Sequence, residues 1–424
     1  MKIIYLSRSF PYTEVEAFLT PEITALTRRG HEVLIVPRSP KRFIVHGDAQ
    51  PMVDITRTQA LVSLEIIKAA LAEVRRSPIK AVKALSLLMR SRNANILMKN
   101  LAVYTKGLWL AQIAREWGAT HIHAHWATYT ATMALIASEV SEVPWSFTAH
   151  RHDIVANNLL ALKIRKASFG RFISQSGLEL ARSLAIKGIE EKAQLLHMGV
   201  NLSPVAAGTV RRRDISVVFC PANLLPVKGH KYLIEAVTIL KGRGVEVALW
   251  VAGEGELRRS LQEQVDRSGL CHQVSFLGQL SHTEVLRLYA EATVDMVVLP
   301  SVDLGNGEHE GIPVALIEAM SYSIPVISTA TGGVPELLNE GAGLLVPPQD
   351  GFALANAIDR LLNDTALKEQ IAGAGRRRVE DEFAIEKIVT ELAAHFERGG
   401  IKSSQEPDLE NSCISAITLH NRQS

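Results

Sequence analysis

The sequence has 424 residues, of which 47% are apolar and 21% charged, and its formal net charge is +2 at neutral pH. This predicts a globular protein of two or three domains, and the near-neutral charge argues against a nucleic-acid partner. Three scattered cysteines give neither a disulfide framework nor a metal-binding spacing, and no run reaches the roughly 18–20 apolar residues of a membrane span, so we expect a cytoplasmic protein or one that lies on the inner membrane surface.

The chain begins with alternating strand and helix. Residues 2–7 predict a strand, 18–29 a helix ended by Gly30, and 31–36 a second strand, which together make a right-handed βαβ unit. The first loop lacks the Gly-x-Gly-x-x-Gly pattern, which argues against a dinucleotide cofactor. We therefore predict an α/β fold that opens with a doubly wound parallel sheet, and no cofactor.

The next region is helical and basic. Residues 61–117 predict a long helical segment interrupted near Pro78. Between residues 60 and 106 there are nine basic residues, Lys68, Arg75, Arg76, Lys80, Lys83, Arg90, Arg92, Lys99 and Lys106, against Glu65 and Glu73. Interleaved apolar residues make this stretch amphipathic, and we interpret it as a surface for anionic lipid headgroups. The alternative is an ordinary pair of solvated helices packed on the domain.

Two histidine clusters follow at the ends of predicted strands. Residues 121–126 end one strand with three histidines at alternate positions, and residues 145–149 form another that leads to His150. Ligands of α/β sheets bind beyond the carboxyl ends of the strands, which makes His125 and His150 candidate site residues. Alternating histidines could also hold a metal, but no carboxylate or cysteine partner is evident, so we expect none.

A linker divides the chain into two halves. Proline, glycine and small residues followed by three arginines indicate a linker at residues 201–214, between domains at 1–200 and 215–384. Strands and helices alternate again in the second half. Residues 385–397 predict a final amphipathic helix, and the polar tail 398–424 is expected to be disordered.

The most informative stretch runs from Glu310 to Glu318. An apolar run before it predicts a buried parallel strand, and its own residues favour a helix with Pro313 in the first turn. Two carboxylates at this spacing do not define a function alone. Amides at the start of such a helix are suited to phosphate or sugar oxygens, and here they would be those of Gly311, Ile312 and Val314.

The surrounding pattern resembles that of a known family. Glu310-Gly-x-Pro-x-x-x-x-Glu-Ala is followed by Pro325-Val-Ile-Ser and by Thr331-Gly-Gly-Val-Pro-Glu. This combination resembles the retaining glycosyltransferases of family 4, which have the GT-B fold of two Rossmann-like domains facing across a cleft. The resemblance is strongest over residues 217–362, and it is closest in character to bacterial exopolysaccharide and colanic-acid glycosyltransferases.

The resemblance assigns a nucleotide-sugar donor site to the second domain. The residues concerned are Asn223, Lys228, Gly311, Ile312, Pro313, Val314 and Glu318. Lys228 would bind the diphosphate, and Glu318 would accept hydrogen bonds from the ribose hydroxyls. The family usually has an arginine where Asn223 stands, so one cation of the leaving-group site is missing.

The resemblance also implies a reaction centre and an acceptor side. His150 matches a family histidine that contacts the donor sugar, and with Glu310 it is predicted to be catalytic. The loop Phe10-Pro-Tyr-x-x-x-Glu16 is similar to a family loop near the acceptor, so Glu16 and His125 are predicted on that side. Alternatively, this loop only packs over the edge of the sheet. In the GT-B fold, the final helix crosses back to the first domain.

We therefore predict a retaining hexosyltransferase that uses a nucleotide-sugar, with UDP favoured, and a lipid-linked or surface-polysaccharide acceptor. A metal-independent reaction is expected because no Asp-x-Asp motif follows a strand. One alternative is a nucleotide-sugar-modifying enzyme of the same fold, such as an epimerase. Another is a catalytically silent scaffold that binds a glycan or a partner, which the missing arginine at Asn223 favours.

Overall fold

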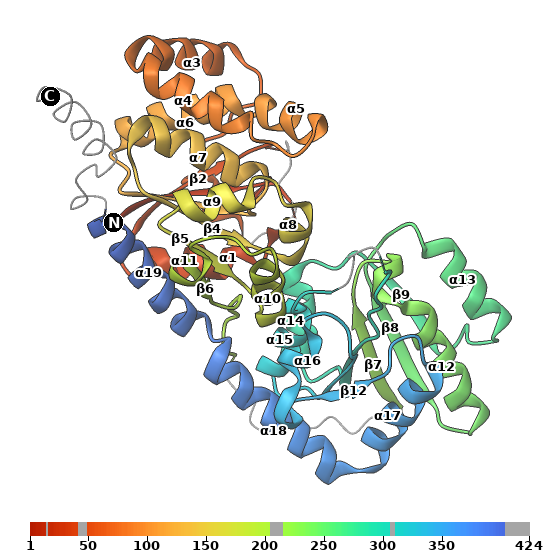
Figure 1. The fold of residues 1–424 in the computed structure, drawn as a ribbon. Coiled ribbons are helices and arrows are strands. Elements are labelled where there is room, and N and C mark those ends of the chain that lie inside the picture. Colours follow the sequence, from red (N-terminus) through yellow and green to blue (C-terminus); the bar gives the residue numbers. More distant parts are fainter. Residues whose placement is uncertain (14–15, 41–48, 204–214, 306–309, 403–424) are drawn as a thin grey trace, which may run out of the picture.

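The chain forms two parallel sheets of six strands each, connected by helices that cover both faces (Figure 1). The computed structural model describes residues 1–13, 16–40, 49–203, 215–305 and 310–402, with side chains to residue 399. Most of the predicted linker and of the predicted tail lies outside these residues.

The first sheet has the strand order β2-β1-β3-β4-β5-β6. Its strands are β1 (Lys2–Ser7), β2 (Glu32–Pro37), β3 (His121–His125), β4 (Trp145–Ala149), β5 (Phe169–Phe172) and β6 (Ala193–Leu195). Its helices are α1 (Leu19–Arg28), α2 (Gln50–Val53), α3 (Leu64–Arg76), α4 (Pro78–Leu88), α5 (Ala94–Ala102), α6 (Tyr104–Trp117), α7 (Tyr129–Ser141), α8 (Arg151–Ala156), α9 (Leu160–Lys166), α10 (Gln175–Ser183) and α11 (Ile189–Lys192). The strand order reverses between β1 and β3, which places a crevice beyond the carboxyl ends of these two strands.

The second sheet has the order β12-β11-β10-β7-β8-β9, with the reversal between β7 and β10. Its strands are β7 (Ser216–Pro221), β8 (Val247–Ala252), β9 (Val274–Gly278), β10 (Met296–Leu299), β11 (Val326–Thr329) and β12 (Leu344–Val346). Its helices are the short η3 (Pro226–Lys228) and η4 (Asn339–Gly341), with α12 (His230–Gly242), α13 (Arg258–Arg267), α14 (His282–Ala290), α15 (Val314–Ser321), α16 (Val334–Leu337), α17 (Gly351–Asn363) and α18 (Thr365–Glu382).

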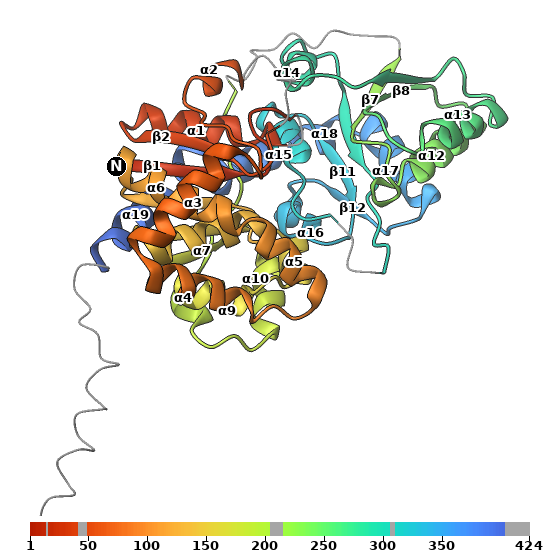
Figure 2. The same cartoon turned by 90° about the horizontal axis from the view of Figure 1, so that it is seen from above.

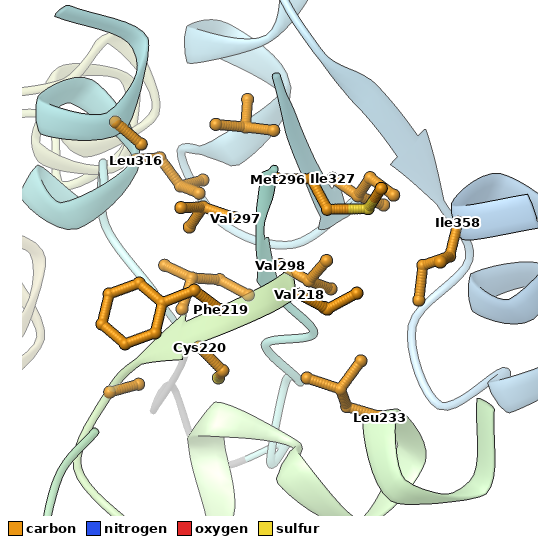
Figure 3. Packing of buried hydrophobic residues seen from close by; sticks show 14 of the residues in the cluster. Val218, Phe219, Cys220, Leu233, Met296, Val297, Val298, Leu316, Ile327 and Ile358 are labelled. Carbon is orange, nitrogen blue, oxygen red and sulfur yellow. The ribbon is translucent and has the colours of Figure 1, made fainter. Parts of the chain in front are cut away.

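The second core explains why the central strands read as continuous apolar runs. Residues of β7 and β10 are buried between helices on the two faces of the sheet, so both alternating sets of side chains must be apolar. Figure 3 shows Val218, Phe219 and Cys220 of β7 beside Met296, Val297 and Val298 of β10, with Leu316, Leu233 and Ile358 contributed by helices. This core holds rigidly the loops that follow the two strands.

The last helix, α19 (Ile385–Lys402), leaves the second domain and packs on the first (Figures 1 and 2). Phe396 is fully buried against Phe169 and His121 of the first sheet, and Arg29 donates a hydrogen bond to Glu386. The helix extends to residue 402, beyond the predicted end at 397. The chain passes between the domains near residues 200 and 384, where Val200 exchanges two backbone hydrogen bonds with Phe383 and Ile385.

The basic segment forms the four helices α3 to α6, and Pro78 occupies the first turn of α4, where its missing N–H is harmless. One assignment is wrong. Lys106 does not belong to the basic surface, because its side chain is fully buried and donates to the carbonyls of Pro37, Arg38 and Gln59. Local amphipathic spacing could not reveal these distant carbonyls.

Candidate functional site

The first-domain site lies in the crevice beyond β1 and β3. The loop after β1 contributes Glu16, β3 ends at His125, and His150 follows the adjacent strand β4. The ring nitrogens Nε2 of His125 and His150 lie 2.8 Å apart. The Trp126 ring packs on His150 at 4.2 Å between centroids, and Phe18 contacts both histidines. The structure thus brings together the predicted His125 and His150.

Burial controls the charge of this histidine pair. Desolvation, followed by neighbouring positive groups, lowers the pKa of both His125 and His150 well below the usual value. Both rings are therefore neutral at pH 7, and only one of the two facing Nε2 atoms can donate to the other.

A buried hydrogen-bond chain decides which nitrogen donates. Arg171 on β5 pairs with Glu22 at 2.6 Å, and the hydroxyl of Tyr5 lies 2.6 Å from the other oxygen of that carboxylate. Burial raises the pKa of Glu22, but attraction to Arg171 and hydrogen bonds from Tyr5 and Arg171 outweigh it, so this pKa is lowered overall. An ionised Glu22 only accepts.

The direction of the chain then follows step by step. Tyr5 donates to Glu22, so its oxygen accepts from Nδ1 of His125 at 3.2 Å. A neutral His125 with its proton on Nδ1 accepts at Nε2. Nε2 of His150 is consequently the donor in its hydrogen bond with His125. The ionised Glu22, at the buried end of this hydrogen-bond chain, thus fixes the tautomer of His150, the predicted catalytic histidine.

Glu16 is a structural centre of the first loop. It is 1% exposed, and its two oxygens accept from the backbone amides of Arg8, Ser9 and Phe10 and from Nε1 of Trp126 at 2.6–2.9 Å. This carboxylate therefore shapes the wall of the crevice and has little capacity left for a ligand.

The second-domain site lies at the corresponding reversal, beyond β7 and β10. Nζ of Lys228 is 2.6 Å from Oε2 of Glu310, and Ser301 lies 3.3 Å from the same oxygen. Gly229 makes this approach possible, since its φ is +66° and an added Cβ would lie 1.9 Å from the carbonyl oxygen of Pro300. Two predicted residues, separated by 82 positions, are thus in direct contact.

Helix α15 begins at Val314, directly after the proline that was predicted in its first turn. Pro313 is its N-cap, so Gly311 and Ile312 belong to the loop before the helix. Gly333 packs against these two residues, where a Cβ would lie 2.9 Å from the Ile312 side chain. The predicted Thr331-Gly-Gly motif therefore supports the loop of Glu310. Asn223 is exposed on the loop after β7.

Glu318 has a partner that sequence reasoning missed. His282, at the start of α14, places Nε2 2.7 Å from Oε1 of Glu318. Both line a small pocket between the domains, of about 50 Å³, together with Phe18 and Val314. Because Phe18 also contacts the histidine pair, the two predicted sites lie on either side of this residue.

Other missed residues are Tyr5, Glu22, Arg171 and Trp126. The sequence signal for Trp126 was its position directly after a strand end. The other three are strand and helix residues whose burial resembles that of ordinary core positions, and nothing local marks Glu22 and Arg171 as partners across 149 positions.

A carboxylate partner for the histidines of β3, not evident in the sequence, is supplied by α1. Ligand atoms of Glu22, His123 and His125 lie within 4.8 Å of one another. Each also has hydrogen-bonding partners: Ser146 and Thr148 bind His123, while Arg171 and Tyr5 bind Glu22. All three residues therefore take part in hydrogen bonds with described residues of the first domain.

Part of the chain is similar in sequence to known glycosyltransferases. Residues 209–378 match the family model of glycosyl transferases group 1. The putative colanic acid biosynthesis glycosyltransferase WcaL of Escherichia coli is 36% identical over 211 residues, 48% of this chain and 50% of that protein. The amylovoran biosynthesis glycosyltransferase AmsK of Erwinia amylovora is 32% identical over 59% of this chain and 62% of that protein. The matched part of the chain thus spans about half or somewhat more of these relatives.

A solved structure extends the likeness to the whole fold. The crystal structure of Anabaena Alr3699/HepE in complex with UDP has a TM-score of 0.67 at 20% identity and covers 94% of this chain and 100% of that one. The chain therefore has the predicted GT-B fold, and the stretch that matches glycosyl transferases group 1 lies almost wholly in its second domain.

Proposed function

We propose that the protein is a retaining glycosyltransferase that transfers a hexose from a UDP-sugar to a glycan of a bacterial surface polysaccharide, without a metal ion. The observation that carries this proposal is the contact of Lys228 with Glu310, beside the α15 loop, at the strand-order reversal of the matched domain. The names of the WcaL and AmsK relatives support polysaccharide synthesis, and the UDP complex of Alr3699/HepE suggests the nucleotide.

The donor site follows from the second-domain contacts. Lys228 would exchange its ion pair with Glu310 for the diphosphate, which leaves Glu310 to bind sugar hydroxyls. His282 would hold Glu318 in place for the ribose hydroxyls. Backbone amides before α15 would stabilise the charge that develops on the leaving diphosphate. With Asn223 in place of an arginine, Lys228 would supply the side-chain cation.

The first domain would supply the reaction centre. His150, held as an Nε2–H donor to His125, would contact the donor sugar from the opposite side of the cleft. Attack of the acceptor on the face from which the diphosphate departs would retain the anomeric configuration. Closure of the domains around the cleft would exclude water and limit donor hydrolysis.

A transfer assay tests this function. Panels of UDP- and GDP-hexoses would be incubated with lipid-linked glycans, in Mg²⁺ or EDTA, and the product's anomeric configuration read by NMR. We expect transfer from a UDP-sugar in both buffers, with retention. Glu310→Gln should reduce the rate by about 10²-fold or more. Glu263→Gln, which changes an exposed carboxylate on α13, serves as the matched control.

The same assay separates the alternatives. Conversion of the donor sugar without an acceptor would indicate a nucleotide-sugar-modifying enzyme, and binding without turnover would indicate a silent scaffold. Inversion of configuration would contradict the retaining mechanism, and loss of activity in EDTA would contradict its metal independence.

We propose in addition that α3, α4 and α5 hold the protein on the anionic inner face of the cytoplasmic membrane. No helix in the described ranges is long and apolar enough to cross a membrane. Each of the three helices nevertheless exposes apolar side chains, 38–83% accessible: Leu64, Ile67, Leu71 and Val74 on α3, Ile79 and Val82 on α4 with Met89 directly after it, and Met98 and Leu101 on α5. These helices form a layer on the outer side of the first domain (Figure 1).

The basic side chains of this surface indicate anionic lipid headgroups as its partner. Exposed Lys68 and Arg75 flank the apolar stripe of α3. Arg90 adjoins the exposed Met89 after α4, and Lys99 adjoins the exposed Met98 on α5. Apolar side chains would enter the interface while the cations contact anionic headgroups. Two cations of this region, Lys80 and Lys83, form ion pairs with α7 and its cap residue and contribute less.

Vesicle sedimentation tests the membrane proposal. Binding to vesicles of phosphatidylcholine with phosphatidylglycerol should exceed binding to phosphatidylcholine alone, and it should weaken in high salt. The double variant Ile67→Ser/Leu71→Ser should lower the partition coefficient at least tenfold, because each buried apolar side chain contributes about 1.5–3 kcal/mol. Phe352→Ser, at an exposed apolar position of the second domain, should bind normally. Equal loss in both variants would contradict the assignment.

A further inference from the structure

A large cavity lies on the first domain beside the histidine pair. It measures about 680 Å³, and loops after β1, β2 and β3 form its walls together with residues of α5. Trp126, whose ring packs on His150, lines it. A cavity of this size accommodates a sugar or a small phosphorylated group.

The cavity is strongly basic. Of the described residues, Arg8, Arg38, Lys99 and His152 line it, against one carboxylate, that of Glu16. That carboxylate is already used by three backbone amides and the Trp126 indole. Among the described residues, neither Arg8 nor Arg38 forms an ion pair with a carboxylate. Three cations, Arg8, Arg38 and Lys99, therefore face one carboxylate among the described lining residues, so this lining carries a net positive charge.

The fold holds the two arginines next to each other. The amide of Arg38 donates to Ser7, and the amide of Ser39 donates to Arg8, both at 2.9 Å, so β1 and β2 deliver Arg8 and Arg38 side by side. The guanidinium of Arg38 lies over the Tyr129 ring, 5.6 Å from its centroid. Burial, followed by the positive charge of Arg8, lowers the pKa of Arg38 below its usual value. Adjacent guanidinium groups repel, and an anion between them would remove this repulsion.

Buried lysines fix the loops that carry the cavity. Lys106 binds the carbonyls of Pro37, Arg38 and Gln59 at 2.6–2.8 Å. Lys163 binds those of Ala127 and Thr128 at 2.9 and 2.6 Å. The Arg38 loop and the loop after Trp126 are therefore pre-organised, and a ligand would not have to order them.

We propose that this cavity binds a phosphate group of the acceptor, held by Arg8 and Arg38, with the adjoining sugar or chain lying against Trp126 and Tyr129. This rests on the proposed transferase function, since it names the chemical class of the acceptor. Guanidinium groups bind phosphate through paired hydrogen bonds, which is the geometry that two adjacent arginines provide. Leu61, Ala102 and Val103 add an apolar wall near α5, against which the chain of a lipid phosphate would pack.

Calorimetry with short probes tests this site. Geranyl diphosphate, inorganic pyrophosphate and geraniol would be titrated into the full chain with UDP present to fill the donor site. We expect geranyl diphosphate to bind, and Arg38→Gln and Arg8→Gln each to weaken it about tenfold or more, the usual effect of losing a charge-assisted hydrogen bond. Arg28→Gln, at an exposed arginine in the last turn of α1 that does not line the cavity, is the matched control and should bind normally.

The pattern of affinities separates the possible sources of the phosphate. Preference for geranyl diphosphate over pyrophosphate supports a lipid phosphate, and equal affinity supports a soluble phosphorylated acceptor. Equal binding of geraniol, or binding unchanged in both arginine variants, would overturn the proposal. Unchanged thermal unfolding temperatures would show that the variants are folded.

Loss of UDP binding at the donor site can be distinguished from loss of phosphate binding at the cavity. Lys228→Met should lose UDP and keep geranyl diphosphate, whereas the arginine variants should do the reverse. A protein that binds geranyl diphosphate through Arg8 and Arg38 but binds no nucleotide would retain the phosphate site and lose the transferase assignment.

Discussion

At the scale of single residues, the donor site depends on one backbone position. Gly229 joins η3 to α12 in a left-handed conformation, with φ at +66°, and the Pro300 carbonyl lies where a Cβ would be. The approach of these two loops is what brings Lys228 to Glu310.

Gly229→Ala should therefore reduce both stability and UDP affinity, because the loops must separate to admit the methyl group. Gly242→Ala, at the end of the same helix, has open space around its Cβ and should be neutral or stabilising by up to about 1 kcal/mol. Urea denaturation and calorimetric UDP binding would measure the two effects. Equal behaviour of the two variants would contradict the described contact.

The buried chain from Arg171 to His150 makes a second residue-scale prediction. Tyr5→Phe removes the acceptor for Nδ1 of His125, so the tautomer of His150 is no longer fixed. Transfer should slow about tenfold or more, with UDP affinity unchanged, and ¹⁵N NMR of the imidazoles should show a mixture of tautomers. Tyr104→Phe, which removes a hydrogen bond to the Ala81 carbonyl, should leave both unchanged. If His150 kept a single tautomer in Tyr5→Phe, Tyr5 would not determine the direction of the hydrogen bond between His125 and His150.

At the scale of elements, the sequence predicted most strands and helices because their signals are local. Buried parallel strands appear as apolar runs, Gly30 ends α1, and Pro78 starts α4. Contacts between residues far apart in the sequence could not be predicted from local patterns. Lys106 was counted with a basic surface, and the partnership of Glu318 with His282 joins two helices that no sequence pattern connects.

The contact of α19 with the first sheet should be a large element-scale contribution to stability. Phe396 is fully buried against Phe169 and His121, so Phe396→Ala should cost about 3–5 kcal/mol of unfolding free energy. Phe352→Ala removes the same ring from a position that is 59% exposed and should cost about 1 kcal/mol or less. Chemical denaturation would compare the two. A small cost for Phe396→Ala would mean that α19 is not firmly docked.

At the scale of the whole molecule, buried neutral histidines make stability depend on pH. Burial lowers the pKa of His121 and His123 to about 3, whereas an unfolded histidine titrates near 6.5. Between these values the unfolded chain binds protons that the folded chain does not, so the free energy of unfolding falls as the pH falls from about 6.5 towards 3.

His121→Leu removes one of these groups and should make that decline shallower, by up to about 1.4 kcal/mol per pH unit. Ser146 would keep its hydrogen bond with His123. Urea denaturation from pH 7 to pH 4 would measure the difference, in which the common titration of carboxylates cancels. If the free energies of unfolding of the two proteins changed with pH in parallel, His121 would take up its proton in the folded state as readily as in the unfolded chain.

The second GT-B domain carries the Lys228–Glu310 pair and the first carries the neutral histidine pair, while Phe18 contacts the histidines and lines a pocket with Glu318. The proposed transfer requires that Lys228, Glu310 and Glu318 of the second domain bind the nucleotide of the donor. Calorimetric titration of UDP and GDP into the wild type and Glu318→Ala, in Mg²⁺ and in EDTA, measures this binding. We predict that UDP binds equally in both buffers, more tightly than GDP, and at least tenfold more weakly to Glu318→Ala. Absence of nucleotide binding, or binding unaffected by loss of Glu318, would contradict the assignment of these residues to the donor site.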